Sequence, residues 1–153
     1  MQQAFARQNS EQKRGARAWK DIKAVKLLDT SKEKKLEKEY RSRARGLNAM
    51  IQINGLGQTL GFLKAKGKRD ERNPCYLLLS HLSAWMRDPE HFRVTNGSAM
   101  KDKYDDLLEW VLDPGTSSDD YRRATTECLA FGVWLSRFAE AELKEPDAGD
   151  DVK

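Results

Sequence analysis

Residues 47–68 read LNAMIQINGLGQTLGFLKAKGK and hold two helical patterns with a break between them. The first apolar stripe ends at Ile51, and the Asn54-Gly55 pair that follows allows a left-handed residue and a sharp turn. A second apolar stripe predicts a new helix over residues 55–67. Its members are Leu56, Leu60 and Leu63. The break therefore indicates one helix followed directly by another.

Two glycines of the second helix, Gly57 and Gly61, lie four residues apart and so share a face. Missing side chains there would let another helix approach closely. We therefore expect alanine at Gly61 to destabilise the protein by crowding, despite its better helix propensity. The cations at the end of this helix suit its dipole. They include Lys64, Lys66 and Lys68.

Two more helices are predicted upstream, each with a basic row opposite its apolar stripe. One begins after Thr30 or Ser31 and runs to about Asn54, with a buried face formed by Leu36, Tyr40, Ala44, Leu47 and Ile51. Its basic row comprises Lys34, Lys38, Arg41 and Arg45. The other spans about residues 10–29 after a cap at Asn9 or Ser10, with Ala18, Ile22 and Val25 in its stripe. Its basic row comprises Lys13, Arg17, Lys20 and Lys23.

Three further helices are predicted downstream. The first starts at the Asn73-Pro74 cap and ends at Asp88. The next runs from about Ser98 to Asp113, and the last from Ser117 or Ser118 to about Lys144. The predicted core of the whole chain includes Leu36, Tyr40, Leu47, Ile51, Leu60, Leu63, Leu78, Trp85, Leu108, Trp110, Cys128 and Leu135.

The 153 residues suffice for one domain, and alternating strand patterns are absent. We therefore predict an all-α fold without a sheet, a single compact bundle of about six helices over residues 1–144. The acidic segment EPDAGDDVK, residues 145–153, is expected to be a disordered tail. Two cysteines exclude a disulfide scaffold, and no secretory signal or membrane-length apolar run is present. These features indicate a soluble, cytoplasmic protein.

The net charge of +4 conceals a strong segregation. Residues 1–72 hold 19 Lys+Arg and 8 Asp+Glu, whereas residues 73–153 hold 9 and 16. Such asymmetry favours a polyanion as partner of the basic half. Alternatively, the two halves neutralise each other within the fold or in self-assembly.

The two basic rows would form one broad surface if their helices packed side by side. Phosphates along a strand match such rows, and counterion release drives their binding. Few aromatic residues accompany the cations, so we expect contact with the nucleic-acid backbone rather than stacking on bases. The residues predicted to bind nucleic acid are Lys13, Arg17, Lys20, Lys23, Lys34, Lys38, Arg41, Arg45, Lys64, Lys66 and Lys68. The alternative is an ordinary solvated helix face.

The sequence contains no recognisable catalytic or metal-binding constellation. Neither CxxC nor HExxH spacing occurs, and GLGQTLG lacks the Lys-Ser/Thr end of a P-loop. Cys75 and Cys128 are interpreted as small apolar residues, and His81 as structural. His91 is the one plausible general base on a loop. We therefore expect no catalytic residue, no metal and no cofactor.

Two stretches resemble the small α-helical subunit of the type III-B CRISPR effector, the Cmr complex. In the first, the family has an Asn-Gly-Leu turn, a threonine-leucine-x-phenylalanine-leucine run and a lysine, matched here by Asn54, Gly55, Leu56, Thr59, Leu60, Phe62, Leu63 and Lys66. In the second, the family's C-terminal helix is matched by Tyr121, Arg122, Thr125, Glu127, Trp134, Leu135, Arg137, Phe138 and Ala139. The segment LLEWVL at 107–112 also fits, whereas Asn48 stands where the family often has proline.

The resemblance implies a small helical protein without catalytic activity of its own. Family members stack along the guide-RNA-bearing backbone of the complex and line the path of the target strand. The implied partners are other Cmr subunits, guide RNA and target RNA or single-stranded DNA. Other copies of the chain could stack head to tail, the acidic half against a neighbour's basic half. Guide–target pairing would supply the sequence specificity.

Two alternatives of other classes remain open at the level of sequence. One is a small helical metal-dependent nuclease, which would cleave labelled RNA in the presence of a divalent metal. The other is a helical scaffold that binds an acidic protein through the basic half. An affinity for RNA that falls steeply with salt would speak against the scaffold.

Overall fold

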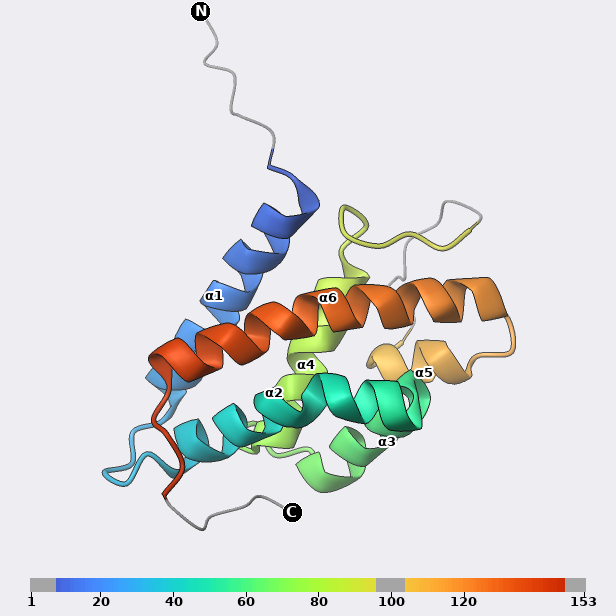
Figure 1. Cartoon of the computed structure of the whole chain (residues 1–153). Helices are drawn as coiled ribbons and strands as arrows, with labels where there is room; N and C mark the ends of the chain where they lie inside the picture. Colours follow the sequence, from blue (N-terminus) through green and yellow to red (C-terminus); the bar gives the residue numbers. More distant parts are fainter. Residues whose placement is uncertain (1–7, 96–103, 148–153) are drawn as a thin grey trace, which may run out of the picture.

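The computed structural model describes residues 8–95 and 104–147, and this part of the chain forms six helices and no strand (Figure 1). The helices are α1 (Ser10–Leu28), α2 (Lys35–Asn54), α3 (Leu56–Gly67), α4 (Pro74–Arg87), α5 (Leu107–Leu112) and α6 (Ser118–Glu142). The prediction of an all-α bundle of about six helices is confirmed. The division of the chain at residue 144 stays a prediction, since only residues 145–147 of the expected tail are described.

The C-terminal helix α6 organises the bundle. It packs against both α1 and α2, and it also contacts α4 (Figure 1). The helices α1 and α2 touch each other much less, so the side-by-side packing that one broad basic surface would require is not found. The helix α3 lies against α4, α2 and α5 and completes the bundle.

The buried residues follow the predicted stripes closely. Ile22 of α1, Tyr40 of α2 and Leu135 of α6 are completely buried. Of the predicted core, only Leu108 differs, because it is partly buried while Leu107 beside it is fully buried. The helix α5 has six residues, and its inward positions are Leu107 and Trp110, three apart.

The predicted caps of three helices are confirmed. The Asn9 side chain accepts a hydrogen bond from the Gln12 amide, and the Gln12 side chain accepts one from the Asn9 amide, a capping box for α1. Asn73 caps α4, with Pro74 at its first position. Ser117 caps α6 through the Asp120 amide.

The helix α2 begins at Lys35, several residues later than predicted, and its N-cap residue Lys34 makes no side-chain cap hydrogen bond. An acid from the end of α1 accepts from an amide of the first turn instead. One Asp29 carboxylate oxygen accepts from the Ser31 amide and hydroxyl, and the other accepts from the Glu37 amide of the first turn of α2. Burial raises the pKa of Asp29, but these hydrogen bonds outweigh it and lower the pKa overall. Residues 29–34 are thus held as a folded connection.

The helix α5 begins at Leu107, so its predicted start near Ser98 is wrong. Residues 104–106 are non-helical, and residues 98–103 lie outside the described part of the chain. The Arg87 side chain donates to the carbonyls of Tyr104 at 2.6 Å and Asp105 at 2.5 Å, which holds this backbone away from a helical ladder. The Leu107 amide then donates to the Ser83 hydroxyl of α4.

The predicted close approach at Gly61 is also wrong, since a Cβ there would meet nothing within 4 Å. The close approach lies at Gly67, where a Cβ would stand 2.9 Å from the backbone of Tyr76. A second lies at Gly132 of α6, where a Cβ would overlap the side-chain oxygen of Asn48. The Asn48 amide nitrogen donates to the Leu129 carbonyl at 2.9 Å, so Asn48 ties α2 to α6.

A polar link joins three helices inside the bundle. The Nε and Nη2 nitrogens of the Arg14 guanidinium in α1 donate to the Glu127 carboxylate of α6, at 2.7 and 2.8 Å. The indole of Trp85 in α4 donates to the same carboxylate at 3.1 Å. Because Arg14 and Glu127 are both mostly buried, this charged pair fixes where α1 docks on α6.

Candidate nucleic-acid interface

The two basic rows converge at the C-terminal end of α6. Along α1, Arg14 pairs with Glu127 and Lys23 pairs with Glu142, so α1 and α6 run in the same direction. Along α2 the order reverses, with Arg41 opposite Leu143 and Asn48 opposite Leu129. The end of α1 and the beginning of α2 therefore meet around the same end of α6 (Figure 1).

An open hollow of about 1170 Å³ lies where these ends meet. Five of its lining residues are cations, supplied by α1, by the 29–34 connection, by α2 and by the segment after α6. They are Lys26, Lys32, Lys34, Arg41 and Lys144. Five are acids, of which all but the first come from the end of α6 and the segment after it: Glu37, Glu140, Glu142, Glu145 and Asp147.

Several predicted binding residues in or beside the hollow form ion pairs or hydrogen bonds with other residues of the protein. Lys23 lies 3.2 Å from Glu142 and over the Trp19 ring, and Lys38 lies 3.0 Å from Asp147. Arg41 donates to the Leu143 carbonyl at 3.2 Å, and Lys34 donates to the Asp29 carbonyl at 3.0 Å. The hydrogen bond from Lys23 is the main reason that the pKa of Glu142 is lowered.

The remaining predicted residues are distributed over other surfaces. Arg17 donates to Asp21, and Lys64 pairs with Asp106 at 2.9 Å. Within the described part of the chain, five others make no hydrogen bond or ion pair through their side chains: Lys13, Lys20, Arg45, Lys66 and Lys68. Of the predicted binding residues, only Lys34 and Arg41 line the hollow. Lys23 and Lys38 lie beside it through their acidic partners Glu142 and Asp147, and the predicted cations of α3 lie outside its lining.

Sequence reasoning missed three cations that line the hollow, Lys26, Lys32 and Lys144. Lys26 could have been found, because it continues the spacing of three residues that joins Lys20 to Lys23. Lys32 and Lys144 lie outside the helices, and no helical spacing could have placed them. Their position depends on how the ends of α1, α2 and α6 meet.

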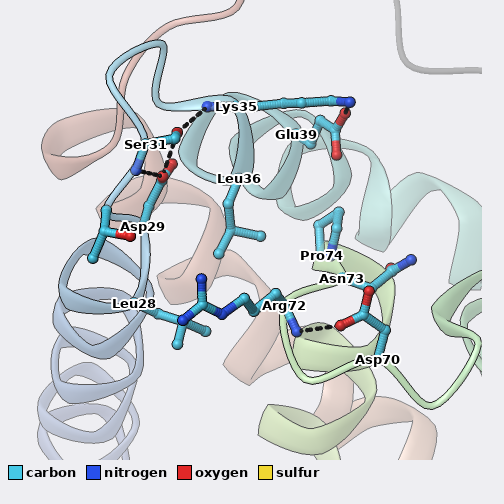
Figure 2. A pocket seen from close by; sticks show the side chains of 11 residues that line it. Leu28, Asp29, Ser31, Lys35, Leu36, Glu39, Asp70, Arg72, Asn73 and Pro74 are labelled. Atoms are coloured by element: carbon cyan, nitrogen blue, oxygen red, sulfur yellow. Dashed lines mark hydrogen bonds and ion pairs between the residues drawn. The ribbon is translucent and has the colours of Figure 1, made fainter.

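A second, smaller pocket of about 380 Å³ lies between the α1–α2 and α3–α4 connections. Figure 2 shows Leu36 pointing into it, with the Arg72 side chain reaching across toward Leu28. Its polar groups are largely engaged with one another, Asp29 with Ser31, Asp70 with the Arg72 amide, and Lys35 near Glu39. This pocket therefore lies where two connections pack together, and the residues that line it carry both positive and negative charges.

The histidines and cysteines are placed as structural residues. The His81 ring accepts from or donates to the Tyr40 hydroxyl at 2.7 Å, and burial is the main cause that lowers its pKa to about 4. The His91 ring stacks on Trp85 with 3.5 Å between ring centroids. Burial raises the pKa of both Cys75 and Cys128. Within residues 8–95 and 104–147 no group of three His, Cys, Asp or Glu side chains could hold a metal ion.

Comparison with known proteins agrees with this architecture. The model of the CRISPR-associated protein family Cas_Cmr5 matches residues 10–142, which is most of the chain. The chain belongs to the Cmr5 family. This family is the small helical subunit of the type III-B Cmr complex.

A solved structure shows the same fold. The crystal structure of a CRISPR-associated Cmr5 family protein from Thermus thermophilus is 22% identical, with a TM-score of 0.61. The match covers 90% of this chain and 100% of the other. Among the described residues of this Cmr5 family member, no helix has the length and apolar character needed to cross a membrane.

Proposed function

We propose that this chain is a non-catalytic small subunit of a cytoplasmic RNA-guided antiviral complex of type III-B. In that complex it stacks along the guide-RNA backbone and lines the bound target strand with a basic surface. Its partners are the other Cmr subunits, the guide RNA, the target RNA or single-stranded DNA, and other copies of itself stacked head to tail. Membership of the Cmr5 family supports the assembly with Cmr subunits.

The observation that carries the nucleic-acid role is the convergence of cations around the end of α6. Lys26 comes from α1, Lys32 and Lys34 come from the 29–34 connection, and all three line one hollow. Lys26 and Lys32 are exposed, and phosphates can therefore reach them. Backbone phosphates spaced along a strand match such a group, whose binding needs no base readout.

The first test is a titration of fluorescent single-stranded RNA at 50, 100 and 200 mM KCl. Substitution of Lys26→Gln and Lys32→Gln removes two exposed cations, so the slope of log affinity against log salt should fall by about 0.7 for each phosphate that is no longer neutralised. A variant with Arg72→Gln and Arg122→Gln loses the same charge outside the hollow and serves as the control. The weakening should be equal for strands of different sequence.

The titration is made on the isolated chain and on the complex purified with a tag on this subunit. Larger subunits and a small RNA should co-purify with the tagged chain. If the hollow variant binds like the wild type in both settings, the nucleic-acid surface lies elsewhere. If the isolated chain cleaves labelled RNA with a divalent metal, and one carboxylate or histidine substitution abolishes cleavage, the non-catalytic assignment is wrong.

A further inference from the structure

The acidic segment that follows α6 lies on the basic surface itself. The Asp147 carboxylate is 3.0 Å from the Lys38 ammonium, and the Leu143 carbonyl accepts from Arg41 at 3.2 Å. The Lys144 amide donates to Glu37 at 3.1 Å, which holds the start of the segment against α2. Glu145 also lines the hollow. The segment thus brings oxygen acceptors to the cations that a strand would use.

We propose that residues 145–147 act as an internal competitor of the nucleic-acid strand. The Asp147 carboxylate on Lys38 of α2 and the Glu145 carboxylate in the hollow occupy positions that strand phosphates would take. The proposal rests on the proposed nucleic-acid role of the hollow. Strand phosphates would displace these carboxylates and pair with Lys38 and the neighbouring cations. Weak, non-cognate strands would then be disfavoured, and a strand held by guide pairing would prevail.

The contacts are of a kind that a strand can displace. The Asp147 side chain is 69% exposed, and ion pairs at such positions contribute little to folding stability. The anchor behind it is firmer, because Leu143 is buried and its amide continues the ladder of α6 to the Ala139 carbonyl. The segment can therefore leave α2 beyond residue 144 while α6 stays in place.

Charge balance supports the same conclusion. The five cations of the hollow face five acids, and Glu145 and Asp147 are the two that lie beyond the helix. Glu37 is bound to the Lys144 amide, and Glu142 lies near Lys23 and Lys26. Displacement of the two terminal acids would change the hollow from neutral to net positive, which favours a polyanion.

The test compares two variants with the same change in charge. Glu145→Gln with Asp147→Asn removes the proposed competitor, whereas Glu71→Gln with Asp119→Asn neutralises two exposed acids that do not line the hollow. Both are titrated with fluorescent single-stranded oligouridine RNA at 50 to 200 mM KCl, as isolated chains and as assembled complexes. Thermal unfolding midpoints check that both stay folded.

The competitor variant should bind about 3- to 10-fold more tightly than wild type at 50 mM KCl, the gain expected from about one additional phosphate contact. The control should change by less than about 2-fold. Inorganic polyphosphate should also bind the competitor variant more tightly than wild type, by a similar factor, because the uncovered site recognises phosphate rather than bases.

Each other outcome overturns the proposal. If the competitor variant binds like wild type while Lys26→Gln with Lys32→Gln weakens binding, the segment does not compete and the proposed function stands. If the affinity for RNA rises equally in the competitor and control variants, the effect is one of net charge alone. If none of the proteins binds RNA, alone or in the complex, both this inference and the nucleic-acid role fail.

Discussion

At the scale of single residues, four titratable side chains form a cluster between α1, α2 and α4, in which Asp21 and Tyr40 are buried and Arg17 and His81 are partly buried. Asp21 accepts from Arg17 at 3.2 Å with one carboxylate oxygen, and its other oxygen is buried without a hydrogen-bond partner. Burial raises the pKa of Asp21 to about 6, although Arg17 opposes the shift. Burial, together with Asp21, also raises the pKa of Tyr40, whose hydroxyl contacts His81. The cluster thus keeps His81 neutral and Asp21 readily protonated.

These shifts predict opposite pH dependences that cancel in the wild type. Between about pH 4 and 6 the folded pair carries its proton on Asp21, whereas the unfolded pair carries it on His81, so the two states bind equal numbers of protons. In Asp21→Asn only the lowered pKa of His81 remains, and stability should fall as the pH drops from about 6.5 to 4. In His81→Gln only the raised pKa of Asp21 remains, and stability should fall as the pH rises from about 4 to 6.

The free energy of unfolding of each single variant should change by up to about 3 kcal/mol over its pH window, because each pKa lies roughly 2 away from its ordinary value. Urea unfolding at pH 4.5, 5.5 and 6.5 measures the three profiles. The wild type is the reference for both variants, because the contribution of this pair to its free energy of unfolding is independent of pH in this interval. Slopes of the same sign in the two variants would show that the cluster does not hold its proton as described.

At the scale of elements, the contact of α3 with α4 depends on one residue without a side chain. Gly67 ends α3 and faces the backbone of Tyr76 in the first turn of α4. Gly67→Ala should therefore destabilise the protein by about 1–3 kcal/mol through overpacking. Gly61→Ala, in open space on the same helix, should instead stabilise it by up to about 1 kcal/mol through helix propensity.

Chemical denaturation of both alanine variants and the wild type measures these differences. The comparison is internally matched, because each substitution adds one methyl group to the same helix. A loss of stability at Gly61 equal to that at Gly67 would mean that close packing continues along the helix.

The elements that the sequence predicted well are those with local signals. Asn73 before Pro74 marks the start of α4, and Ser117 marks that of α6, because short side chains cap the first turn directly. The starts of α2 and α5 were misplaced because distant groups set them. Asp29 accepts from the first turn of α2 across a loop, and Arg87 of α4 binds the backbone before α5. Neither partner can be inferred from spacing.

The candidate interface shows the same difference between local signals, which the sequence reveals, and contacts between distant residues, which it does not. Helical periodicity placed Lys38 and Arg41 on the polar face of α2, and the structure has both there. It could not show that Leu143 and Asp147 bind them, because that contact joins residues more than 100 positions apart. The convergence of α1 and α2 at the end of α6 is likewise a product of tertiary packing.

At the scale of the whole molecule, the acidic half and the basic half pair within the fold. Arg14 with Glu127, Lys23 with Glu142 and Lys64 with Asp106 each join a cation of residues 1–72 to an acid of residues 73–153. Internal neutralisation, the alternative interpretation of the charge asymmetry, therefore accounts for part of it. The cations left at the surface, such as Lys20 and Arg45, are the remainder available to an external partner.

Because α6 contacts α1, α2 and α4, a defect in its buried face should weaken the entire bundle at once. Leu135 is completely buried, and Leu135→Ala should cost about 2–5 kcal/mol. Val133→Ala on the same helix removes a side chain that is 41% exposed and should cost less than about 1 kcal/mol. Circular dichroism and tryptophan fluorescence should report one common urea transition for each protein. Separate transitions for the two probes would show that the bundle has independent parts.

The order of the described helices, with α6 after the five others, has a consequence for synthesis on the ribosome. The stripes that contain Ile22 and Tyr40 are made early, yet the helix that covers them is completed only at Glu142. At roughly 5–20 residues per second, these surfaces stay uncovered for on the order of ten seconds. Nascent chains that stop before α6 should thus be substrates for chaperones and proteases, because the core closes only when α6 has been made.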